Sequence, residues 1–421
     1  MHKRLSAVLM ILSTFAIGQV TNPPPSAAVS PVAQSVVEAG KQIAEKPTQY
    51  AGFNLLAMAL IRRAQETSDA SYYVQAEDAV RKSLELAPNN FDAGKVRVSI
   101  LLSEHEFPAA LDAARALNKR VPDDVMVYGL LTDANVELGN YNDAETSAQW
   151  MLNLRPGNRP ALIRAAHLRE VFGDEEGAYE VMDLAYQSTP PTETEERASI
   201  LTEMGHLRFA SGSLDTAEKL LLQALTVSPG YPCALGHLAR VREAQKRFGD
   251  AVLLLQQRYQ AAPRPGNLYE LAEALQSAGR DGEARKAFTE FESQAVRESA
   301  KRDNSNRELV FYYADHAHRP AQALKPAEQE YDRRHDVYTL DAYAWALHVN
   351  GQDPEARKQI ETALAVGIRD AKLFFHAGVI ALKSGDREAA ERYLKQSAEL
   401  NSEDRERARN IWAGLTQSAH R

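Results

Sequence analysis

The sequence predicts an all-α protein built from about ten helix hairpins stacked into one elongated array. Three observations predict this fold class. Alanines recur in one register at intervals of 33, 34 or 39 residues, each lies in a stretch typical of two helices and a turn, and no segment alternates apolar and polar residues for long enough to form a strand. The ten alanines are Ala76, Ala110, Ala144, Ala178, Ala217, Ala251, Ala284, Ala323, Ala356 and Ala390.

The composition limits the class of protein and of partner. The chain has 421 residues, of which 44% are hydrophobic and 25% charged, and a net charge of −8. This length exceeds what one compact core usually holds, which favours an array over a single domain. The excess of acid disfavours nucleic acid as a partner, because nucleic-acid binding needs a basic surface.

The N-terminal segment, residues 1–18, has the layout of a secretory signal peptide. Lys3 and Arg4 supply the positive start, and an apolar run over residues 5–17 follows. This run is shorter than the roughly 20 apolar residues that span a bilayer, and cleavage is expected after Gly18. We therefore expect export from a bacterial cytoplasm to the periplasm or the medium, with an uncleaved inner-membrane anchor as the alternative.

Residues 19–46 are predicted to form a Pro-rich linker and a short N-terminal helix. Three consecutive prolines, residues 23–25, favour an extended chain. The helix is expected over residues 32–45, before Pro47. No later stretch is long and apolar enough to cross a membrane, so no transmembrane span is expected after signal cleavage.

One repeat, residues 198–229, shows the pattern behind the hairpin prediction. Gly212 interrupts a first helical segment, and Asp215 is placed to cap the second. From Ala217 onward, apolar residues at i, i+3, i+4, i+7 and i+8 line one helix face. Pro229 ends this helix because proline has no N–H to donate.

These residues resemble the tetratricopeptide repeat family, whose 34-residue unit is a helix–turn–helix. The repeat that starts at Ala198 matches seven of eight family positions, and Arg208 departs at the remaining one. The seven matching residues are Leu201, Met204, Gly205, Ala217, Leu221, Ala224 and Pro229. The resemblance covers about residues 57–402 and implies a right-handed superhelical solenoid with a concave groove.

Two spacings of 39 residues divide the array into blocks. We predict about four repeats over residues 47–190, about three over 191–296, and about three over 297–402, the first of these last three being irregular. The extra residues fall near 190–197 and 297–306. They are interpreted as loop slack, because added loop length costs little; the alternative is a hinge or a loop that contacts a partner.

Residues 403–421 are predicted to form a C-terminal capping helix. Stacking covers the apolar face of every hairpin except the last, which needs a cover with a polar outer side. Glu403 and Asp404 suit a helix N-terminus, and Trp412 and Leu415 belong to an apolar stripe.

No motif predicts catalysis, a cofactor or a metal. The chain lacks a phosphate-binding glycine loop, an HExxH zinc motif and a GxSxG nucleophile motif. His316 and His318, two residues apart, would face different sides of a helix. Glu203 and His206 are interpreted as a solvent-exposed pair on one helix and not as metal ligands. We expect no enzymatic activity; chemistry hidden within residues 297–337 is the alternative.

The resemblance implies that positions 2, 5, 9, 12 and 13 of each first helix line the groove. Aromatic residues gather on that face in the C-terminal half, and Tyr and Trp dominate binding hot spots. Packing between neighbouring first helices is the alternative interpretation of Tyr312 and Trp345. The candidate binding residues are His167, His206, Tyr269, Tyr312, His316, Tyr338, Trp345 and His348.

The resemblance also allows one binding mode to be set aside. Chaperone-binding members hold a C-terminal carboxylate with Lys and Asn at set positions; Lys95 matches, whereas Ser99 and Leu130 do not.

The single thiol, Cys233, is expected to be buried between repeats, with intermolecular pairing as the alternative.

The leading functional hypothesis is a non-enzymatic scaffold of the bacterial cell envelope that binds a protein or peptide partner in its groove. The alternative is an accessory protein of polysaccharide export or envelope assembly that contacts glycan. Exported members of the family often serve such systems, and Tyr and Trp in a groove suit stacking on sugars.

Overall fold

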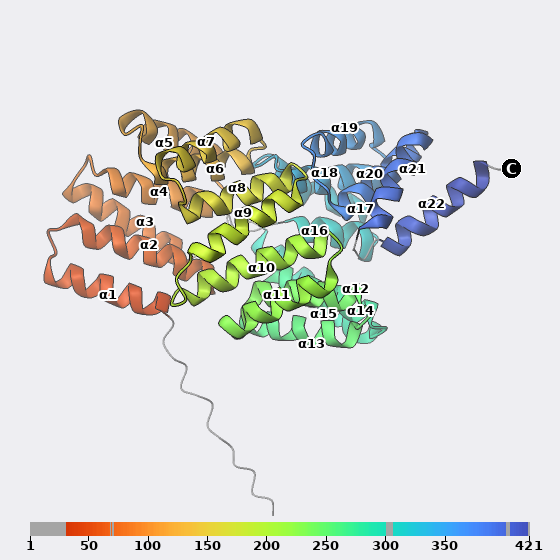
Figure 1. The fold of residues 1–421 in the computed structure, drawn as a ribbon, viewed down its shortest axis with the longest axis horizontal. Helices are drawn as coiled ribbons and strands as arrows, with labels where there is room; N and C mark the ends of the chain where they lie inside the picture. The colour runs from red at the N-terminus through yellow and green to blue at the C-terminus, as the bar shows by residue number, and fades with distance from the viewer. Residues whose placement is uncertain (1–30, 68, 70, 300–305, 401–404, 420–421) are drawn as a thin grey trace, which may run out of the picture.

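The computed structural model describes residues 31–67, 69, 71–299, 306–400 and 405–419 (Figure 1). The predicted signal peptide, most of the linker and part of the second insertion lie outside these residues. Across the described part of the chain there is no strand, and no helix there is long and apolar enough to cross a membrane.

The helices follow one another along the chain and pair as neighbours. In order they are α1 (Pro31–Glu45), α2 (Tyr50–Thr67), α3 (Ser71–Leu86), α4 (Phe91–Ser103), α5 (Phe107–Arg120), α6 (Val125–Glu137), α7 (Tyr141–Leu154), α8 (Arg159–Val171), α9 (Glu175–Ser188), α10 (Thr194–Ala210), α11 (Leu214–Val227), α12 (Pro232–Ala244), α13 (Phe248–Ala261), α14 (Pro265–Ser277), α15 (Asp281–Glu298), α16 (Arg307–Phe311), the π-helix η1 (Tyr312–His316), α17 (Pro320–Tyr331), α18 (Val337–Val349), α19 (Asp353–Leu364), α20 (Ala371–Lys383), α21 (Arg387–Glu399) and α22 (Arg405–Ala419).

The hairpins run from α2–α3 to α20–α21, and one register of small residues holds each together. Every alanine of the predicted register lies on the second helix of a hairpin and is buried. Small side chains at a helix crossing let the two axes approach closely. The predicted array of about ten helix hairpins is therefore confirmed.

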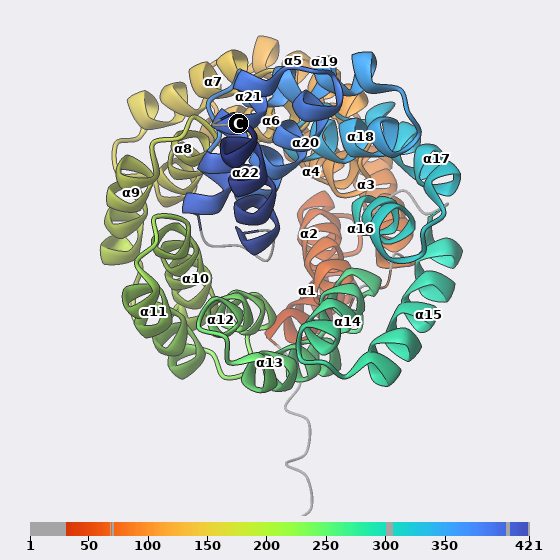
Figure 2. The same cartoon turned by 90° about the vertical axis from the view of Figure 1, so that its right-hand side faces the viewer.

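The stacked hairpins wind into a right-handed superhelix that makes more than one full turn (Figures 1 and 2). Viewed along its axis, the first helices of the hairpins (α8, α10, α12, α14) form the inner ring and the second helices (α9, α11, α13, α15) the outer ring (Figure 2). The inner surface is therefore made of the first-helix faces from which the groove was predicted.

Successive superhelical turns touch along a contact that we call the seam, between α6–α9 and the segment from α17 to α20. The backbone N–H of His335 donates to the carbonyl of Glu137 (2.9 Å), and that of Val337 donates to the Tyr141 hydroxyl (3.0 Å). Arg334 lies 3.3 Å from the Glu137 carboxylate, 197 residues away in sequence. One turn of the superhelix thus takes nearly 200 residues.

The seam also has an apolar core and a close backbone contact. One buried cluster combines Tyr141 and Leu168 of the first turn with Leu340 and Ile360 of the second. In the same seam, Gly173 has φ of 79°, and a Cβ there would collide with the carbonyl oxygen of Gly367. Only glycine allows this combination of positive φ and close approach.

The two insertions lengthen helices, which corrects the expectation of loop slack. The first helices α8 and α12 have 13 residues, whereas α10 has 17 because it begins at Thr194 inside the first insertion. Likewise α15 has 18 residues where α13 has 14. The added residues are mostly good helix formers, so they extend the adjoining helix.

The C-terminal helix α22 covers the end of the array. Ala408 is fully buried against Phe375, Leu394 and Ala398 of the last hairpin, and Trp412 packs on the same cluster. The predicted C-terminal capping helix is therefore present.

Candidate interaction site

The interior of the superhelix contains a cavity of about 580 Å³. Its wall comes from first helices of both turns, including α10, α12, α14, α16 and α18, and from the start of α22. Eight acidic and five basic residues line it, so the cavity suits a polar occupant. Its volume falls within the roughly 300–1,000 Å³ typical of ligand sites.

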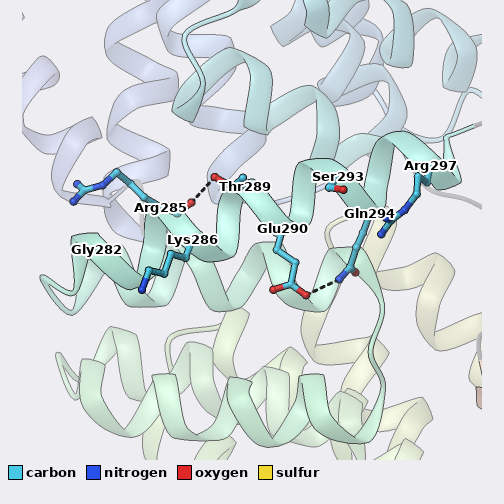
Figure 3. Close-up of a pocket in the computed structure, with 8 residues that line it drawn as sticks. All are labelled: Gly282, Arg285, Lys286, Thr289, Glu290, Ser293, Gln294 and Arg297. Atoms are coloured by element: carbon cyan, nitrogen blue, oxygen red, sulfur yellow. Dashed lines mark hydrogen bonds between the residues drawn. The ribbon is translucent and has the colours of Figure 1, made fainter.

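A second hollow lies on the outside of the superhelix, along α15 (Figure 3). It has a volume of about 810 Å³, but all of its lining residues belong to that single helix. Arg285, Lys286 and Arg297 give it a basic character, and Glu290 accepts a hydrogen bond from Gln294 at 3.0 Å (Figure 3). Because one helix face cannot surround a ligand, the interior cavity is the stronger candidate site.

Histidine and glutamate side chains form a network on the inner faces of α8, α10 and α12. The Nε2 atom of His206 lies 2.7 Å from Glu170 Oε1, and Nδ1 of His167 lies 3.8 Å from Glu170 Oε2. The ring of His237 lies 4.9 Å from that of His206. Among the described residues, no three His, Cys, Asp or Glu side chains meet in a geometry that could hold a metal ion.

The network shifts the pKa values of its members in opposite directions. Burial alone would raise the pKa of Glu170, but the nearby His167 and the hydrogen bond with His206 hold that pKa well below its ordinary value. Burial would lower the pKa of His206, yet its bond to Glu170 raises that pKa above the ordinary value. Burial lowers the pKa of His237 well below its ordinary value. The network therefore favours a His206 cation beside a neutral His237.

Aromatic side chains of α14, α15 and η1 pack together next to the cavity. Tyr269 is 3% exposed, and its ring meets those of Phe288 and Phe291 at 5.9 and 5.1 Å. Tyr312 is also buried and donates from its hydroxyl to Glu292 at 3.0 Å. His316 lies 4.4 Å from the Phe288 ring and 3.3 Å from Glu273.

Farther along the array, Trp345 and His348 are held by neighbouring side chains. Trp345 is 5% exposed, stacks on His376 at 4.1 Å, and donates from Nε1 to Asp315 at 3.1 Å. Nδ1 of His348 lies 2.6 Å from Asp353. The interpretation of Trp345 and Tyr312 as packing residues is the one that these contacts favour.

Three of the eight predicted binding residues, His206, Tyr269 and Tyr338, line the cavity. His167 lies beside it through Glu170, while Tyr312, His316, Trp345 and His348 do not line it. A binding role for each of these residues stays a prediction.

The last hairpin matches a known repeat family. A sequence model described as "Tetratricopeptide repeat" matches residues 371–404, which contain α20 and α21. This hairpin is a tetratricopeptide repeat. A search of curated proteins finds no significant match.

Solved structures of other proteins show weak overall likeness to this chain. The human IFIT1 dimer with PPP-AAAA is 12% identical with a TM-score of 0.48, over 89% of this chain and 96% of that one. The APC/C hetero-tetramer Cut9–Hcn1 is 12% identical with a TM-score of 0.44, over 86% of this chain and 55% of that one. The type IV pilus biogenesis factor PilW is 15% identical with a TM-score of 0.43, over 48% of this chain and 92% of that one. At these identities and scores, the likeness carries no inference about a partner.

Departures from the repeat pattern are compensated by neighbouring residues. Arg208 replaces an aromatic residue and forms two bonds to Glu176, at 2.6 and 3.0 Å, while its guanidinium lies over Tyr179. Arg258 stands where a small residue is expected, and it occupies the space beside Gly236, where any Cβ would lie 2.5 Å from Nη1.

Two features of this repeat protein escaped the sequence analysis. The expected burial of Cys233 is wrong, because the residue is exposed near the start of α12; partial desolvation nevertheless raises the pKa of its thiol. Glu175 and Arg369 both line the cavity, although 194 residues separate them. Their pairing depends on the superhelical pitch, for which repeat spacing carries no signal.

Proposed function

We propose that this protein is a non-enzymatic scaffold of the bacterial cell envelope, holding a segment of a protein partner inside its superhelix. The observation that carries this proposal is the cavity of about 580 Å³, whose wall combines residues from both turns. Tetratricopeptide repeats are typical of protein-interaction scaffolds. The envelope location is supported by the N-terminal sequence, with Lys3 and Arg4 before an apolar run.

The structure lends less support to glycan as the ligand. Sugar stacking needs an accessible aromatic face. The tryptophan on which that alternative depends, Trp345, is covered by His376 and is only 5% exposed. A protein partner therefore remains the proposed ligand class.

Photo-crosslinking in intact cells tests the binding site. A photoreactive side chain replaces Ser277, which lines the cavity, or Ser293, which lies on the outer groove of the same hairpin. We expect one discrete adduct from position 277 and none from position 293. Equal patterns at both positions would contradict interior binding.

Two measurements test the location. Mass spectrometry of the mature N-terminus should show that the residues up to Gly18 have been removed. Protease added to cells with a permeabilised outer membrane should digest the protein. Full protection together with an intact N-terminus would overturn the envelope assignment.

A further inference from the structure

The cavity wall is continuous around the superhelical axis because the seam closes it. On the first turn the wall includes Glu170 and Glu175; on the second it includes Tyr338 and Arg369. Arg369 Nε lies 3.3 Å from Glu175 Oε1, so these two lining residues pair directly across the seam. The interior is therefore enclosed by a ring of helices instead of lying in an open trough.

The C-terminal cap narrows the ring further. Leu400, Arg405 and Glu406, at the junction of α21 and α22, line the same cavity. Seen along the axis, α22 lies within the outline of the ring (Figure 2). Ala408 fixes the helix there, because it is fully buried against the last hairpin.

We propose that the seam is a gate: while it is closed, the interior admits an extended segment of a partner protein and excludes a folded domain. This inference rests on the proposed function and adds the kind of partner. Even a folded domain of about 75 residues has a radius of gyration of about 11 Å, far too large for the cavity. The charges on the wall match the peptide groups and polar side chains of an extended segment.

The ion pairs of the seam differ in burial between its two ends. The pair that faces the cavity, Arg369 with Glu175, is partly exposed, with 54% of the Arg369 side chain accessible. Exposed ion pairs contribute little to stability. At the other end of the seam, Arg334 is almost fully buried and bound to Glu330 at 2.9 Å and to Glu137 at 3.3 Å. That end, the apolar cluster and the Gly173–Gly367 contact hold the turns together, so opening the gate requires a change among these contacts.

Thiol labelling measures access to the interior without knowledge of the natural partner. In a Cys233→Ser background, a single thiol is placed inside by Arg240→Cys or outside by Arg285→Cys. Both arginines are exposed, and they line the cavity and the outer α15 groove respectively. The probes are N-ethylmaleimide, a short Gly-Ser peptide with a maleimide at its end, and a small folded domain carrying the same maleimide.

With the seam closed, we expect the interior thiol to react with N-ethylmaleimide and with the peptide. Its labelling rate with the folded domain should be lower than that with the peptide by on the order of tenfold or more, because that reaction requires a local opening. The exterior thiol should show no such discrimination. Equal folded-domain rates at the two thiols would overturn the proposal.

Glu137→Lys opens the seam by placing a cation against Arg334. The folded-domain rate at the interior thiol should then rise toward that of the peptide. Glu218→Lys makes the same charge change at the pair with Arg242, between α11 and α12 and outside the seam, and should leave the rates unchanged. Circular dichroism verifies that each variant is folded. Tyr141→Phe is a milder second variant, because it removes only one hydrogen-bond acceptor from the seam.

If the seam-opening variants do not raise the folded-domain labelling rate at the interior thiol, the gate proposal would also be overturned. Labelling reports access alone, so it can succeed while the crosslinking of the proposed function fails. The two proposals therefore fail separately.

Discussion

At the scale of single residues, glycine at a helix crossing sets how closely a hairpin can close. A Cβ on Gly205 would lie 2.7 Å from Leu221 Cγ, and Leu221 is fully buried. We expect Gly205→Ala to lower the free energy of unfolding by about 1–3 kcal/mol, measured by chemical denaturation, because the packed leucine must shift. Ala217→Leu, at a fully buried alanine, should cost a similar amount.

Gly282 provides the matched control for this prediction. It lies in the first turn of α15, and a Cβ there would meet nothing within 4 Å. Gly282→Ala should leave stability unchanged or raise it by up to about 1 kcal/mol, because alanine favours the helix. A similar loss in both glycine variants would show that the crossing at Gly205 has no special role.

The Glu170 network predicts how stability depends on pH. Its histidine His206 has a raised pKa in the folded state, so its contribution is fully present below the ordinary histidine value of 6.5 and is lost as pH rises through the raised value. We expect Glu170→Gln to cost about 1.5–3 kcal/mol near pH 6 and clearly less near pH 9. Urea denaturation of wild type and variant across this range measures the difference.

The difference between wild type and Glu170→Gln also removes a competing effect. His237 has a lowered pKa in the folded state, so its own contribution changes with pH in the opposite sense, and the burial that is the main cause of this shift is common to both proteins. A gap between the two proteins that stays constant from pH 6 to pH 9 would mean that His206 does not titrate with Glu170.

At the scale of the element, α22 predicts where the array is weakest once uncovered. Its removal, by ending the chain at Leu400, exposes Phe375 and Leu394 to water. Hydrogen exchange in α20 and α21 should then accelerate on the order of tenfold or more, because end repeats depend on their caps. Exchange in α2 and α3, at the opposite end, should stay as in the full chain; a uniform change would contradict a local capping role.

The hairpins were predictable because a small residue at each crossing is a local requirement that repeats along the chain. The length of α10 was not predicted, because Pro190 and Pro191 suggested a loop, while the helix-forming residues 194–197 after them add a turn. The irregular repeat was expected near Ala323, but its π-helix depends on how Tyr312 and His316 pack against α14 and α15.

The candidate site, too, could be predicted only where the local repeat pattern determines it. His206 and Tyr338 could be placed on the inner face because repeat position alone determines which way they point. For Trp345 the sequence left binding and packing open, because its burial depends on His376 in the next repeat. Exposure on a solenoid is decided by side chains that belong to neighbouring units.

At the scale of the whole molecule, the seam joins parts of an array that would otherwise unfold separately. Repeat proteins are stabilised mainly by contacts between adjacent units, so distant repeats need not unfold together. Here the third and fourth hairpins contact the eighth to tenth through one apolar cluster and the Arg334–Glu137 pair. We expect a single main transition in wild type and a broader or two-step transition in Glu137→Lys, measured by denaturation followed with two probes.

Glu218→Lys serves as the comparison, since it disrupts a pair between adjacent repeats only. Its transition should keep the shape seen in wild type. Identical broadening in the two variants would show that the seam does not couple the turns.

The seam has a consequence for synthesis on the ribosome. Glu137 contacts Arg334, and 197 residues of chain separate them. At about 5–20 residues per second, the partner of Glu137 emerges about 10–40 s later. During that interval the apolar side chains that α6–α9 contribute to the seam are exposed to solvent. The growing chain is therefore prone to aggregation until the second turn has been synthesised. Because the buried second-turn side chains of the seam's apolar cluster extend to Ile380, a translation pause before that residue emerges would prolong the exposure, and a later pause would not.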